Sequence, residues 1–231
     1  MSVTFAEKCG VAVLLPLVLI VLSGCGSERA AAPEPVTPVT FAVFGNSGLA
    51  TDSGETVRAL ATAVNSDSVA FVVDLGNRLG RGLTSAGIGA LWEAVDRDRE
   101  RFDAPVFTIP GGNDIFDFNS DLVYESRYGD SWYSFRRNGV LFVFLNTEDE
   151  SYRGCFGDNG RIGGDQTAWL EKTLNSSRGA PVVVFMHRPL WIENPVLWGA
   201  TLRPLFKSGG VVLVVTANEG GLYDWGEVDG I

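Results

Sequence analysis

The sequence predicts an α/β domain, and two observations support this expectation. Strand-like and helix-like segments alternate from Thr40 onward, which favours a sheet with a parallel core. Apolar residues make up 45% of the 231 residues, so the chain has both the length and the composition to bury a core.

The elements that open the domain follow from their apolar spacing. Continuous apolar runs predict strands, and apolar residues at i, i+3, i+4 and i+7 predict helices. Asp52 is positioned to cap the first helix, with Glu55 three residues later. The expected elements are, in order, a strand at 40–44, a helix with the stripe 57–64, a strand at 69–75, a helix with the stripe 88–95 and a strand at 106–109.

The middle of the domain changes to a hairpin. Asn138-Gly139 is a strong hairpin turn sequence, and it separates the strand-like runs at 132–135 and 140–145. The remaining expected elements are a helix from Asp165 to about Leu174, a strand at 182–186, a helix after Pro195 and a strand at 211–215.

The first 38 residues are expected to be an export signal followed by a disordered tether. Residues 11–22 are apolar but too few to span a bilayer, which suits a secretory signal. The run ends in Leu22-Ser23-Gly24-Cys25, which resembles the bacterial lipobox, so we expect a signal peptide at 1–24 and lipid on Cys25. An ordinary signal peptide with a coincidental Cys is the alternative. Residues 25–38 are rich in Ala and Pro and read as a disordered tether, followed by one domain at 39–231.

The composition limits the partners and the cysteine chemistry. The net charge is −10, and no basic run is present, so nucleic acid is not an expected partner. Outside the N-terminal segment, Cys155 is the single cysteine, which leaves no disulfide framework. The expected location is outside the cytoplasm, on the periplasmic or cell-surface side, through membrane lipid at Cys25.

A polar loop follows each predicted strand. In open α/β sheets, binding and chemistry occur at the carboxyl ends of the strands, so these loops are the candidate site. They are Gly45-Asn46-Ser47-Gly48, Gly76-Asn77-Arg78-Leu79-Gly80, Pro110-Gly111-Gly112-Asn113-Asp114, Asn146-Thr147, His187-Arg188-Pro189 and Thr216-Ala217-Asn218-Glu219-Gly220.

This series resembles the calcineurin-like metallophosphoesterases, and most closely their purple-acid-phosphatase-like branch. That family carries G-D-x-G, G-D-x-x-Y, G-N-H-D, H-x-P and G-H-x-H in this order after the same strands. Trp132–Phe135 and Gln166–Leu170 also match its middle, and the resemblance extends from about Thr40 to Tyr223. It implies a β-sandwich flanked by helices, in α-β-β-α layers, and a site for two metal ions. Only residues 224–231 follow, so we expect a shortened second sheet or a missing C-terminal part.

Amides and glycines stand where the family has metal ligands. The two motif Asp residues fall on Asn46 and Asn77, and the Asn-His pair falls on Gly112 and Asn113. His187 alone is kept among the family's ligands. Asp114 is also kept, and in the family it orients a neighbouring His. The family's last two His fall on Asn218 and Gly220. The degenerate site therefore comprises Asn46, Asn77, Gly112, Asn113, Asp114, His187, Asn218 and Gly220.

These replacements predict a protein without the family's chemistry. A dinuclear site lined by imidazoles cannot form from the single histidine of this chain. Asn resembles Asp in shape but supplies no charge to offset two cations, and without metals no water is activated at neutral pH. We therefore expect no cofactor and no catalytic residue, in a module that binds a small ligand or a protein.

Two other interpretations stay open. Asn46, Asn77 and Asn218 could be turn residues only, and His187 a hydrogen-bonded structural histidine. Alternatively, the chain could be a metal-dependent phosphoesterase (a hydrolase) with an unorthodox single-metal site, built from Asp74, Asp114, His187 and Glu219.

We predict that Cys25 is the lipidated N-terminus of the mature protein. Mass spectrometry of the membrane fraction should detect an acylated Cys25, and Cys25→Ala should release the protein from the membrane. A soluble product with another N-terminus, or full retention of Cys25→Ala, would contradict the lipobox interpretation.

Overall fold

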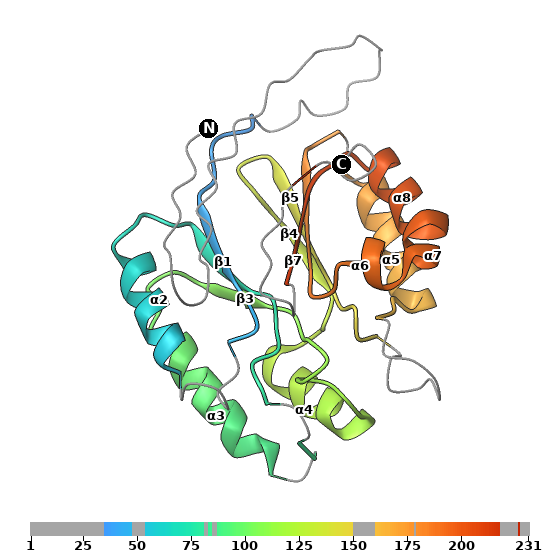
Figure 1. The fold of residues 1–231 in the computed structure, drawn as a ribbon. Coiled ribbons are helices and arrows are strands. Elements are labelled where there is room, and N and C mark those ends of the chain that lie inside the picture. Colours follow the sequence, from blue (N-terminus) through green and yellow to red (C-terminus); the bar gives the residue numbers. More distant parts are fainter. Residues whose placement is uncertain are drawn as a thin grey trace.

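The computed structural model describes residues 35–47, 54–80, 83–84, 87–149, 160–177, 179–217 and 226 (Figure 1). The predicted lipidation site Cys25, the predicted site positions Asn218 and Gly220, and Cys155 lie outside these residues. Within the described ranges, no helix combines the length and the apolar character needed to cross a bilayer.

Two sheets form the centre of the domain. The first is fully parallel, in the order β1-β2-β3, and the second has the order β4-β5-β6-β7, with only β4 antiparallel. The strands are β1 (Phe41–Phe44), β2 (Phe71–Asp74), β3 (Val106–Thr108), β4 (Tyr133–Arg137), β5 (Val140–Leu145), β6 (Val182–Met186) and β7 (Val211–Thr216).

Helices cover the outer face of each sheet, which confirms the expected α-β-β-α layers (Figure 1). In β1, Ala42 and Phe44 pack outward against α2, while Phe41 and Val43 face the other sheet. Every residue of β1 is therefore buried, as is typical of strands covered on both faces. The helices are α2 (Glu55–Asn65), α3 (Ile88–Arg99), α4 (Phe118–Tyr128), α5 (Gly164–Asn175), α6 (Leu190–Glu193), α7 (Pro195–Leu197) and α8 (Arg203–Ser208), with a π-helical stretch at Trp198–Leu202 before α8.

The two sheets point their carboxyl ends the same way. After the strands, His187 Nδ1 reaches the carbonyl of Leu75 at 2.6 Å. Before the strands, Arg137 donates to the carbonyl of Ala70 at 3.1 Å. All the strand-end loops of β1, β2, β3, β5 and β6 consequently lie at one end of the sandwich.

The predicted hairpin is confirmed, whereas one predicted helix start was wrong and one helix was overlooked. Asn138 and Gly139 have φ of 52° and 77°, so the predicted turn between β4 and β5 is confirmed. The predicted start of the first helix was wrong, because α2 begins at Glu55 with Gly54 as its N-cap, at φ 79°. The sequence reasoning also missed α4, which Asp117 starts through a capping box with Ser120.

Aromatic rings fill the space between the sheets. Phe71 stacks on Phe41 at 5.2 Å and meets the rings of Phe107, Phe135 and Phe142 edge-on at 5.7, 5.4 and 5.0 Å. Its side chain is fully buried. It therefore joins rings from both sheets at one point of the core.

Phe71→Ala is expected to lower the free energy of unfolding by about 3–5 kcal/mol, because it leaves a cavity between the sheets. Urea unfolding followed by circular dichroism measures the loss. Phe118→Ala is the matched control, since Phe118 is 58% exposed and its truncation should change stability by less than about 0.5 kcal/mol. Equal effects of the two substitutions would contradict the assigned core.

Candidate functional site

The loops after β1 and β2 are tied together by two asparagines. Asn46 and Asn77 both have left-handed backbones, at φ 55° and 58°. The Asn46 amide donates to the carbonyl of Gly76 at 2.9 Å, and Asn77 Nδ2 donates to Asn46 Oδ1 at 3.0 Å. Asn tolerates this backbone region, so both residues act as turn residues and as a side-chain link between the loops.

Asp114 joins the loop after β3 to the loop after β2. Its Oδ1 accepts from the amides of Arg78 (2.8 Å) and Leu79 (3.0 Å), and its Oδ2 from those of Asn77 (2.6 Å) and Gly111 (2.9 Å). Each oxygen thus accepts two hydrogen bonds, which fills its lone-pair positions. The carboxylate of Asp114 is committed to holding the loops.

Burial and hydrogen bonding act in opposite directions on Asp114. Burial raises the pKa of Asp114, the amides of Gly111 and Leu79 and the nearby His187 lower it, and Asp74 raises it, with a net pKa of about 6. The four amide hydrogen bonds favour the ionised form of this carboxyl.

His187 and Asn113 complete the group of predicted positions that the structure brings together. The amide of Asn113 donates to Asn77 Oδ1 at 2.9 Å. His187 is buried, and its Nδ1 lies 2.6 Å from the carbonyl of Leu75, which can only accept. Nδ1 therefore carries a proton. His187 is thus tied to the loop after β2 and lies near Asp114, whose carboxylate already bonds to the loops.

The sequence reasoning missed a buried ion pair in this site. Arg188 binds Glu148 through two bonds, Nε to Oε1 at 2.6 Å and Nη2 to Oε2 at 2.9 Å, and its Nη1 contacts Glu193 at 2.9 Å. A Cβ added at Gly112 would lie 2.8 Å from Arg188 Nη2 and 3.2 Å from Glu148 Oε2. The guanidinium therefore occupies the space into which the family's Asn side chain at this position would extend.

Asp74 belongs to a second buried ion group. Its Oδ2 lies 3.6 Å from Arg78 Nη1, and Arg78 also contacts Asp98 at 3.5 Å and Ser47 at 3.2 Å. Burial raises the pKa of Asp74, and the Arg78 guanidinium opposes that shift. Asp74 thus faces a guanidinium inside the domain, which makes it a poor ligand for a further cation.

The described residues do not fit a pair of metal ions. Asn46 and Asn77 bond to each other, Asp114 is filled by amides, and a guanidinium stands at Gly112. Within the described ranges, no three His, Cys, Asp or Glu side chains gather as a metal-binding group. The single-metal alternative also draws on Glu219, which lies outside these ranges.

Two solved phosphatases share this fold. A dimetal phosphatase from Danio rerio has a TM-score of 0.60 and 17% identity, over 79% of this chain and 81% of that one. A purple acid phosphatase from yellow lupin (Lupinus luteus) seeds has a TM-score of 0.54 and 14% identity, over 78% of this chain but only 40% of that one. The comparisons confirm the metallophosphoesterase fold that the motif order implied. No protein-family model and no curated protein matches the sequence significantly.

Glu148→Gln is expected to lower the free energy of unfolding by about 3 kcal/mol, because it leaves Arg188 buried beside a neutral partner. Urea unfolding measures the effect. Glu193→Gln is the control, since its carboxylate is 29% exposed and should contribute less than about 1 kcal/mol. The double substitution Glu148→Leu, Arg188→Met should recover most of the lost stability. If Glu148→Gln costs no more than Glu193→Gln, and the double substitution recovers nothing, then Arg188 and Glu148 do not form a buried ion pair.

Proposed function

We propose that this chain is a lipid-anchored, non-catalytic binding module built on the metallophosphoesterase fold. The observation that carries the proposal is that side chains of the candidate site form hydrogen bonds with one another and with the loop backbone. Asn77 is at the position of the family's bridging carboxylate. Its side-chain amide donates to Asn46 and accepts from the backbone amide of Asn113. These bonds stabilise loops, and a neutral amide offers two cations no compensating charge.

The ion pair of Arg188 and Glu148 supports the same conclusion. A guanidinium is permanently charged, so it repels a metal ion placed beside it. Its carboxylate partner is already bound through both oxygens. What the strand ends offer is a preorganised polar surface of amides and one imidazole, which suits recognition of a small ligand or a protein.

The attachment point supports a site that faces away from the membrane. The amide of Thr37 donates to the carbonyl of Asn138 at 3.2 Å, and Asn138 Nδ2 donates to that of Pro38 at 3.3 Å. The chain thus enters the domain beside the β4–β5 turn, at the end of the sandwich opposite the strand-end loops. A lipid on Cys25 would leave those loops accessible to a partner in solution.

A metal-dependent phosphoesterase with one ion is the second candidate. It is favoured by the imidazole of His187, near the carboxylates of Asp74 and Asp114, and by the names of the two structural neighbours. The two candidates differ in metal content and in turnover, which can be measured together.

The full-length protein is expected to bind no stoichiometric metal after loading with zinc, iron or manganese, and to leave p-nitrophenyl phosphate unhydrolysed. Elemental analysis and a parallel activity assay test this. Asn46→Asp combined with Asn77→Asp should not restore activity, because positions 113, 218 and 220 still lack imidazoles. One or two metals per chain, with turnover abolished by His187→Ala, would establish the single-metal enzyme instead.

A further inference from the structure

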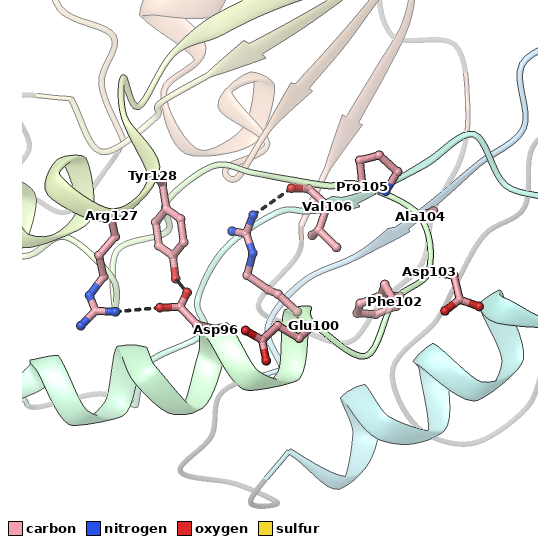
Figure 2. Close-up of a pocket in the computed structure, with 10 residues that line it drawn as sticks. Asp96, Glu100, Phe102, Asp103, Ala104, Pro105, Val106, Arg127 and Tyr128 are labelled. Carbon is pink, nitrogen blue, oxygen red and sulfur yellow. Dashed lines mark hydrogen bonds and ion pairs between the residues drawn. The ribbon is translucent and has the colours of Figure 1, made fainter.

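An open groove runs along the free edge of β3 (Figure 2). It consists of two adjoining hollows of about 710 and 440 Å³, which share Arg99, Val106, Arg127 and Tyr128. The C-terminal half of α3 and the end of α4 form its walls, and Tyr133 of β4 lines its far end. None of the lining residues belongs to the degenerate site.

The edge of β3 presents two unused backbone donors to this groove. The ladder to β2 uses the carbonyl of Pro105 and the amide of Ile109, so the amides and carbonyls of Val106 and Thr108 point away from β2. Both carbonyls are occupied, since Val106 accepts from Arg99 Nη2 at 2.8 Å and Thr108 from Tyr133 OH at 2.9 Å. Within the described part of the chain, neither of the two amides has a hydrogen-bond acceptor.

Acidic side chains outnumber basic ones in the groove. Arg127 is paired with Asp96 at 2.7 Å, whereas Arg99 keeps its positive charge, lies on the ring of Tyr128 at 4.6 Å and donates to the carbonyl of Val106. The remaining charged lining residues are the exposed carboxylates Glu100, Asp103 and Asp130, which form no ion pair within the described ranges. The groove therefore complements a cationic ligand.

We propose that this groove binds an extended peptide segment of a partner protein that carries Lys or Arg side chains. Two backbone carbonyls of the segment accept hydrogen bonds from the amides of Val106 and Thr108. These residues are two positions apart in β3, so their amides point to the same side of the strand. Its basic side chains meet the carboxylates, and its apolar side chains lie against Tyr128 and Tyr133.

A second copy of this chain does not fit the groove. Its own β3 edge would bring carbonyls already held by Arg99 and Tyr133, so donors would face donors. It would also bring the same acidic side chains, and like charges repel. The capped carbonyls thus act against self-association along the edge and leave it to a partner with free acceptors.

This inference goes beyond the proposed function, because the groove would bind its partner whether or not the strand-end loops hydrolyse anything. The test uses the full-length protein in detergent and a labelled peptide, acetyl-(Lys-Thr-Val)₃-amide, with binding followed by fluorescence anisotropy. The matched probe acetyl-(Glu-Thr-Val)₃-amide should bind at least about tenfold more weakly.

Val106→Pro removes one outward donor and leaves the ladder to β2 intact, because Pro is tolerated on an edge strand whose N–H faces out. It should weaken the basic peptide about three- to tenfold, the value of one hydrogen bond. Glu100→Lys with Asp103→Lys should weaken it about tenfold at low salt, whereas Glu171→Lys, an exposed residue of α5, should not.

Hydrogen exchange provides a readout that needs no substitution. Bound peptide should slow exchange at the amides of Val106 and Thr108 and leave the loop around Asn77 unchanged. Slowed exchange with weakening by Val106→Pro would support strand addition. Absence of binding, equal binding of the acidic peptide, or weakening by the charge reversals alone with unchanged exchange would overturn it.

Discussion

The carboxylate of Asp114 holds together the end of the molecule where a site is expected. Its four amide hydrogen bonds come from two loops, which follow different strands and are separated by more than thirty residues. With Asp114 in place, Asn77 is aimed at Asn46 and at the Asn113 backbone. The geometry of the strand ends thus depends on hydrogen bonds within the chain.

Charge balance at these loops is also achieved within the chain. Buried carboxylates need positive partners, and in this domain guanidinium groups supply them: Arg188 for Glu148 and Arg78 for Asp74 and Asp98. The glycine at position 112 leaves the space for the first of these groups. Gly112 and the pair of Arg188 and Glu148 are therefore parts of one packing arrangement.

Much of the fold follows from local patterns, whereas the ion pairs do not. Asn138-Gly139 predicts the β4–β5 turn because these residues favour a left-handed backbone. Buried strands such as β6 can be recognised in the sequence as continuous apolar runs. The helix α4 was overlooked because it buries only Ser120 and Tyr124, too few residues to show a periodic stripe. Arg188 and Glu148 lie 40 positions apart, and no local spacing links them; their contact depends on which loops the sheet order brings together.

A guanidinium differs from a metal ion in how it is retained. Arg188 is covalently part of the chain, so its positive charge cannot dissociate, be exchanged or be removed by a chelator. Loops organised around a dinuclear centre lose their cations when metal is scarce, while these loops keep theirs as long as the chain is intact. A chelator would therefore leave the positive charge of Arg188 in place beside Glu148.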